Sequence, residues 1–394
     1  MPRNKTVVVA VLGSTETLHW ASSYYLPAVL GAPIAAGLGI STDAFFGFFS
    51  AALLLGAAIS PWVGRLIDKH GGRAVLTAAS AIIAAGQALL GLSQGIGTLI
   101  LAWAFLGIGM ALGLYDPAFA ALTRLYGRDA RAPITGITLI AGFASTIGWP
   151  LSAWMQHTLG WREACLIWAA VNLFLSMPLN WLVIPPAPPL PGRSSLRADA
   201  HEDAAPRRAM PVLAFYFAAA AFVTGAMAAQ LPRLLMTAGA TQTAAIAAGT
   251  LVGPAQVAAR LVEFGLLRAI HPVWSARIAV LMHPIGAAVL GALGPFGVAG
   301  FALLHGAGNG MVTIAKGTLP LAVFGPFGYG LRNGILSVPA RVSLSAAPFL
   351  FGLLLDRVGA ASVLLTAGLS LAAFASLLLL RPATAPAAAP LAGD

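Results

Sequence analysis

Residues Pro61–Leu76 read PWVGRLIDKHGGRAVL and form a charged segment between two long apolar runs, in a chain of which only 9% is charged. Gly64 allows two helices to approach closely, and Gly71 permits turn conformations that other residues resist. Asp68 supplies a carboxylate, which is favoured beside the positive N-terminal end of a helix. The segment therefore predicts a tight turn whose flanking helix contacts another part of the chain.

The composition excludes a soluble globular protein. Of 394 residues 59% are hydrophobic, and the mean hydropathy is +0.86. The net charge of +10 lies between apolar runs, so it indicates membrane topology rather than nucleic-acid binding. The single Cys165 excludes an internal disulfide and a cysteine metal cluster. No GxxxxGK[ST] loop occurs, which argues against an ATP-driven pump, and we expect no cofactor and no metal.

Twelve apolar runs, each long enough to cross a bilayer, recur along the chain. They lie at about 7–33, 43–66, 74–93, 97–122, 132–156, 164–185, 211–236, 243–267, 274–295, 298–323, 334–355 and 360–381. A stretch rich in proline and charge separates the first six from the last six, which is typical of a flexible linker. The predicted organisation is a six-helix half at 1–185, a linker at 186–209, a six-helix half at 210–381 and a disordered tail at 382–394.

The charged segment resembles a motif of the major facilitator superfamily, roughly G-x-x-x-D-[RK]-x-G-x-[RK] after the second span. The matching residues here are Gly64, Asp68, Lys69, Gly71 and Arg73. The resemblance implies an all-α integral membrane protein with twelve transmembrane helices in two pseudo-symmetric six-helix bundles. It also implies a gating role for these five residues. The chain departs from many antiporters of this superfamily at Trp103, where they carry an arginine shortly before a Gly-x-Gly.

The distribution of cations predicts the orientation. With the N-terminus inside, 16 of the 22 Lys and Arg residues lie on the cytoplasmic side and three lie outside. The remaining three, Arg260, Lys316 and Arg341, lie within predicted spans. We therefore expect a multi-pass protein of the cytoplasmic (inner) membrane with both termini in the cytoplasm. Arg341, near the start of its span, is expected to extend its guanidinium toward the cytoplasmic surface.

Ionisable side chains inside the first half are candidates for proton coupling, because such groups are costly within a membrane. Glu16 and His19 share one stripe of the first predicted span, and Asp116 lies in the fourth, directly before Pro117. Burial disfavours the charged form of a carboxyl group, so these acids are suited to carry protons. The alternative for Glu16 is a structural hydrogen bond to His19 or to a neighbouring helix.

The second half carries cations instead. Arg260 follows Gln256 on one face of the eighth predicted span, where Glu263 is placed to form an ion pair with Arg260. In the tenth span His305, Asn309 and Lys316 fall within about 40° of one another around the helix. No acid lies within one turn of Lys316 on its own helix. Its charge therefore needs a partner from elsewhere, either a transported anion or Asp116 across the cavity.

These features predict a secondary transporter, not an enzyme, that moves a small organic anion by alternating access with proton coupling. Guanidinium binds carboxylate through two parallel hydrogen bonds, so the expected substrate residues are Arg260, Gln256, Asn309, Lys316 and His305. The expected partners are the lipid bilayer, a small-molecule solute and protons, with the protein acting as a monomer. One alternative is proton-driven efflux of a drug or toxic compound, with Glu16 and Asp116 binding the cargo. Another is a membrane sensor that transports nothing.

Overall fold

The computed structural model describes residues 4–187 and 208–380, and all regular structure within these ranges is helical. The first range contains α1 (Lys5–His19), η1 (Trp20–Tyr24), α2 (Pro27–Gly37), α3 (Thr42–His70), α4 (Gly72–Gly91), α5 (Ile96–Gly113), α6 (Tyr115–Tyr126), η2 (Gly127–Ala130), α7 (Arg131–Ala141), α8 (Ala144–Thr158), α9 (Trp161–Val171), η3 (Asn172–Ser176) and α10 (Met177–Val183). The second contains α12 (Ala209–Thr237), α13 (Gln242–Thr250), α14 (Val252–Gly265), η4 (Leu267–Ala269), α15 (Pro272–Leu293), η5 (Gly294–Gly297), α16 (Val298–Phe324), α17 (Tyr329–Val358), η6 (Gly359–Ser362) and α18 (Val363–Leu378).

Each predicted apolar run falls on one helix or on consecutive helices. The described residues contain eight helical segments, some of them made of several consecutive helices, that are long and apolar enough to cross a membrane. Three of these, Ile96–Thr158, Pro272–Phe324 and Tyr329–Leu378, each cover two predicted runs. The all-helical membrane fold is thus confirmed, and the number of twelve crossings stays a prediction. The predicted linker and tail fall almost wholly outside the described residues.

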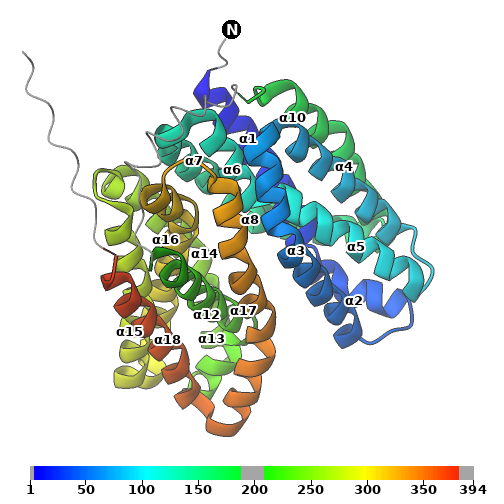
Figure 1. Ribbon diagram of the computed structural model, residues 1–394. Helices are drawn as coiled ribbons and strands as arrows, with labels where there is room; N and C mark the ends of the chain where they lie inside the picture. The colour runs from blue at the N-terminus through cyan, green and yellow to red at the C-terminus, as the bar shows by residue number, and fades with distance from the viewer. Residues whose placement is uncertain (1–3, 188–207, 381–394) are drawn as a thin grey trace, which may run out of the picture.

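The helices of the two halves of the chain lie on opposite sides of a boundary (Figure 1). Along it α3 packs against α17, and α7 packs against α14 and α16. The opposite ends of α3 and α17, far from the N-terminus of the chain, diverge in Figure 1. The boundary is therefore closed at the end of the molecule where α1 begins.

One hydrophobic core continues across this boundary. Most of its buried residues come from α1, α4, α6 and α7, but Leu321 of α16 and Tyr329 of α17 belong to it as well. The other cores each draw on one half only. Apolar burial of about 25 cal/mol per Å² thus contributes to the closure as well as to each half.

A break between α5 and α6 positions the acid of the fourth predicted span. Pro117 has no N–H, so the carbonyl of Gly113, four residues earlier, loses its helical partner. The ring of His19 takes this place, with Nδ1 2.9 Å from the Gly113 oxygen. The backbone is extended at Leu114, and α6 then begins with Asp116 in its first turn, where a negative charge is favourable.

Candidate functional site

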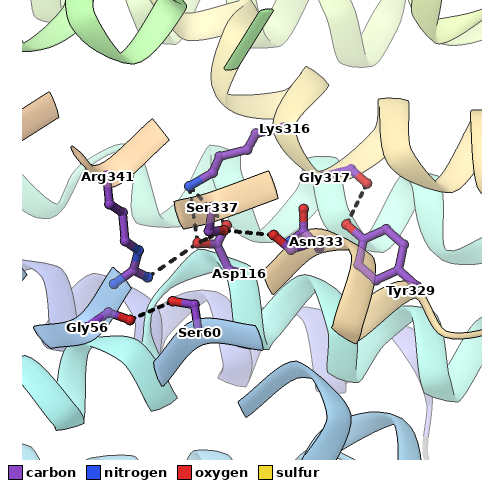
Figure 2. Close-up of polar contacts among 9 residues, drawn as sticks. All are labelled: Gly56, Ser60, Asp116, Lys316, Gly317, Tyr329, Asn333, Ser337 and Arg341. Carbon is purple, nitrogen blue, oxygen red and sulfur yellow. Dashed lines mark hydrogen bonds and ion pairs between the residues drawn. The ribbon is translucent and has the colours of Figure 1, made fainter. Parts of the chain in front are cut away.

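Asp116 lies at the centre of an ion cluster that crosses the boundary (Figure 2). Its Oδ1 is 2.9 Å from Nζ of Lys316 on α16, and its Oδ2 is 3.3 Å from Nη2 of Arg341 on α17. The hydroxyl of Ser337 donates to Oδ2 at 2.8 Å. The side chain of Asp116 is 8% exposed and that of Arg341 12%. With one carboxylate for two cations, the cluster holds one net positive charge.

This cluster settles two expectations from the sequence. Of the two partners considered for Lys316, the structure supplies Asp116. The expectation that Arg341 extends toward the cytoplasmic surface is wrong, because its guanidinium turns inward to the same carboxylate. Gly56 of α3 makes room for it: a Cβ at Gly56 would lie only 2.8 Å from Nη1 of Arg341.

Arg260 is a buried cation, 5% exposed, that has no acidic partner anywhere in residues 4–187 or 208–380. Its Nη1 donates to the carbonyl of Thr138 on α7 at 3.1 Å, and its Nη2 lies 3.4 Å from Oγ1 of Thr313. Its Nε has no hydrogen bond within this part of the chain. Gly142 leaves the space it occupies, because a Cβ there would overlap Nη1. The guanidinium thus reaches from α14 into the first half with its charge uncompensated.

The expected ion pair between Arg260 and Glu263 is not formed. Glu263 instead pairs with Arg131 at the start of α7, with Nη2 and Oε1 3.3 Å apart. Spacing of three residues permits contact on one helix, but here the two side chains take different partners across the boundary. Arg260 therefore lacks the neutralising acid that the sequence predicts for it.

Glu16 and His19 differ sharply in their surroundings. Glu16 is fully buried, and neither carboxyl oxygen has a hydrogen bond of ordinary geometry within the described chain. The indole of Trp20, one turn along, interacts with this carboxyl group. His19 has both ring nitrogens bonded, Nδ1 to the Gly113 carbonyl and Nε2 to Oγ of Ser80, each at 2.9 Å. His19 therefore links α1, α4 and α5, and neither of its ring nitrogens is available to bond Glu16.

The polar residues predicted on the tenth span divide between two places. His305 faces α15, with its Nδ1 3.1 Å from Nδ1 of His283. Asn309 accepts a hydrogen bond from Thr224 of α12 at 2.7 Å, and it remains half-buried, as does Gln256 of α14. Only Lys316 reaches the ion cluster. His305 and Asn309 line one small pocket within the second half, together with Thr224 and His283.

The charged segment makes the contact that its sequence suggests. The carboxylate of Asp68 accepts hydrogen bonds from the backbone N–H groups of Gly330 and Leu331, both at 2.8 Å. These N–H groups belong to the first turn of α17, where the helix dipole favours a negative charge. One turn before Asp68 on α3, a Cβ at Gly64 would overlap the carbonyl of Gly330. The helices α3 and α17 therefore touch through their backbones.

The other motif residues support the turn. Gly71 ends α3 with φ +82°, a left-handed conformation that favours glycine. Arg73 stacks on the ring of Trp181 at 4.2 Å, and Lys69 is exposed. Gly64 and Asp68 therefore make the contacts across the boundary, whereas Gly71 and Arg73 hold the first half together.

Sequence reasoning missed Ser337 as a member of the cluster. A signal was present, since Asn333, Ser337 and Arg341 recur at intervals of four in an apolar helix and so form one polar stripe. Thr138, which binds Arg260 through its backbone carbonyl, carried no such signal, because a main-chain acceptor is available at every residue.

The sequence model of the Major Facilitator Superfamily matches residues 12–315. The chain belongs to this superfamily. As a member it is a multi-pass membrane transporter, and the contact of Asp68 with α17 lies in the segment that resembles the superfamily motif. An MFS-type efflux pump of Mycolicibacterium smegmatis is 31% identical over 189 residues, 46% of this chain and 42% of the pump.

Human monocarboxylate transporter 11 is 32% identical to this superfamily member over 158 residues, 37% of this chain and 32% of that transporter. Among solved structures, the human organic anion transporter MFSD10 (TETRAN) superposes with a TM-score of 0.74 at 17% identity. That match covers 96% of this chain and all of the other. At this identity the likeness shows the fold, not the cargo.

Proposed function

We propose that the protein carries a small organic anion by alternating access, with proton coupling. Arg260 is the observation that carries this proposal. A buried guanidinium without an acid costs several kcal/mol even on lenient insertion scales, and a bound carboxylate would offset this cost through a charge-assisted pair. The name of one relative, a monocarboxylate transporter, agrees with this cargo.

The ion cluster supplies a second positive region for the same anion. Lys316 is 29% exposed although it pairs with Asp116, so a cargo carboxylate is able to compete for it. Gln256 and Asn309 are half-buried amides that remain candidates for polar contacts with the cargo. His305 lines the same pocket as Asn309 and remains a candidate with it. His19 lies outside the proposed proton path, because both of its ring nitrogens are bonded.

Glu16 is the proposed proton carrier. Glu16 is fully buried and makes no hydrogen bond of ordinary geometry within the described chain, and burial disfavours the charged form of a carboxyl group. Asp116 already faces two cations, which favour its charged form. Its proposed role is therefore to respond to cargo binding, and it does not carry the proton alone. Release of the Glu16 proton would follow hydration of the site.

The closed end of the boundary is the proposed cytoplasmic gate. Gly64 and Asp68 form its contact with α17, and Lys69, Gly71 and Arg73 belong to the same motif. The loops at this end of the molecule carry the excess of Lys and Arg residues. This excess supports a cytoplasmic location of the gate, with both termini in the cytoplasm and the protein in an inner membrane. In this orientation the described conformation is closed to the cytoplasm. We further propose that a monomer suffices, because the sites proposed here use one chain.

The test compares carboxylates with their amides as stabilisers of the purified carrier. A ligand that binds only the folded state raises its melting temperature by mass action. Carboxylates, and not the amides, should stabilise the parent, and Arg260→Gln should lose this effect. Gly142→Ala provides a matched perturbation, because it displaces the guanidinium without removing its charge. If Arg260→Gln retains full stabilisation by carboxylates, the proposal is wrong.

Efflux of a cationic or neutral compound is the second candidate, since the unbonded carboxyl of Glu16 offers a site for a cation. The relative named as an efflux pump agrees with it. In the same experiment, stabilisation by amines that depends on Glu16 and not on Arg260 would favour this candidate.

A further inference from the structure

Four aromatic side chains of the first half form a continuous aromatic wall, defined here as Trp20, Tyr24, Tyr25 and Tyr115. The ring of Trp20 lies 5.1 Å from Tyr24, 5.8 Å from Tyr25 and 4.9 Å from Tyr115, measured between centroids. The wall thus contains three of the six tyrosines in the chain. It is built by a helix end and by the start of α6, which lie far apart in sequence.

A π-helical turn sets the positions of two tyrosines of the aromatic wall. The segment η1, Trp20–Tyr24, interrupts the first predicted span, and the hydrogen bond from Tyr25 N to the Trp20 carbonyl at 3.0 Å closes this wider turn. Such turns are rare, and they frequently occur at functional sites. Here the turn brings Tyr24 and Tyr25 beside Trp20.

The wall lies close to the charged groups of the proposed site. Tyr115 directly precedes Asp116, whose carboxylate pairs with Arg341. Tyr115 also shares one hydrophobic core with Ala141, next to Gly142, where the guanidinium of Arg260 lies. The first half therefore contributes aromatic side chains, and the second half contributes guanidinium groups, to the same region.

The wall is not a sealed core. Trp20, Tyr24 and Tyr25 are partly exposed, and within the described residues none of the three wall hydroxyls makes a hydrogen bond. The hydroxyls of Tyr126 and Tyr216, outside the wall, also lack a hydrogen bond in the described chain, so partial exposure is the feature that sets the wall apart. Adjacent, partly exposed aromatic side chains beside a buried cation are suited to receive a ligand.

We propose that the aromatic wall binds a planar ring of the cargo, so that the substrate class is aromatic carboxylates. This inference rests on the proposed anion transport: Arg260 holds the carboxylate, and the rings of the wall pack against the attached ring. Aromatic pairs gain attraction beyond their buried area because of their quadrupoles. A saturated ring of similar size with the same carboxylate lacks this gain.

Calorimetric titration of the purified full-length carrier with three probes tests the inference. Benzoate has the ring and the charge, cyclohexanecarboxylate has the charge only, and benzamide has the ring only. The parent should bind benzoate about three- to tenfold more tightly than cyclohexanecarboxylate. Tyr25→Leu should abolish this preference, and Tyr25→Phe should keep it. Tyr126→Leu, the same change outside the wall, is the matched control and should keep it as well.

The outcomes separate the two proposals. Equal affinity of the parent for the two carboxylates overturns the aromatic class and leaves anion transport standing. An unchanged preference in both Tyr25→Leu and Tyr24→Leu overturns the role of the wall, and Tyr24→Leu also serves if the first variant does not fold. Failure of both carboxylates to bind, or benzamide binding as tightly as benzoate, overturns anion transport and this inference together.

Discussion

Arg131 and Glu263 form an ion pair that joins α7 to α14, with Nη2 and Oε1 3.3 Å apart. The same guanidinium donates to the carbonyl of Ile270 at 2.7 Å and to that of Leu267 at 3.3 Å, just after α14 ends. At the other contact, Asp68 accepts from the first turn of α17. A cation thus lies at a helix C-terminal end and an anion at a helix N-terminal end, the two arrangements that helix dipoles favour.

Asp68→Asn should open the contact between α3 and α17 more often. The amide keeps one acceptor oxygen but loses the charge at the helix end, a loss of about 1 kcal/mol. That shifts a balanced two-state population about fivefold. The measurement is thiol labelling of a Ser60→Cys reporter in a Cys165→Ala background, since Ser60 is buried beside this contact. Equal labelling rates in the reporter protein with and without Asp68→Asn would remove Asp68 from the gate.

Arg131→Gln should destabilise the closed end at its second contact. It removes the ion pair with the buried Glu263 and the charge that faces two carbonyls, for which we expect a loss of about 1.5–3 kcal/mol. The same labelling assay should report faster reaction. Arg357→Gln removes a cation from an exposed side chain in the last turn of α17, away from this end of the boundary, and is the control, for which no change is expected. Faster labelling in both variants would point to a general effect of net charge.

Asp116→Asn should lower the melting temperature of the empty carrier more than Lys316→Gln or Arg341→Gln. Removal of Asp116 leaves two cations without their shared carboxylate, whereas removal of either cation leaves the carboxylate paired with the other. Breaking a buried pair costs about 3–5 kcal/mol. Thermal unfolding of the three variants measures the order. Equal melting temperatures would show that hydration, not the ion pairs, stabilises these charges.

Glu16→Gln should uncouple transport from protons while leaving exchange intact. The amide copies the shape of the carboxyl group but does not titrate, and no hydrogen bond of ordinary geometry is lost in the described structure. In proteoliposomes, accumulation driven by a pH gradient should disappear, and exchange of labelled cargo without a gradient should persist. A variant that still concentrates cargo with full pH dependence would leave Glu16 a purely structural residue.

The fold followed from the sequence because its cause is local: a run of apolar residues long enough for a bilayer forms a helix whatever its neighbours are. The partners of charged residues were harder to predict. Glu263 lies three residues from Arg260, yet it pairs with Arg131, which is 132 residues away. Such a choice depends on how α7 docks against α14, and spacing along one helix carries no information about it.

The docking of Asp68 was predictable for a different reason. A carboxylate that follows a close-packing glycine is favoured beside a free helix N-terminus. The resemblance of this segment to the superfamily motif pointed to the same contact. Arg341 shows the opposite case. Its position near a span end permits both an outward and an inward rotamer, and only the carboxylate of Asp116, which belongs to the other half, decides between them.

The backbone contact between Gly64 and Gly330 has a kinetic consequence. A Cβ on either residue would overlap the main chain of the other, and a Cβ on Gly334 would likewise overlap the carbonyl of Ser60. Backbone meets backbone at these glycines, so a rotamer change of a side chain does not separate the two helices there. The two helices have to separate as rigid bodies, because close-packed interfaces switch between discrete arrangements rather than deform continuously. Single-molecule recordings across this seam should therefore show abrupt steps between two levels, with no dwell at intermediate separations.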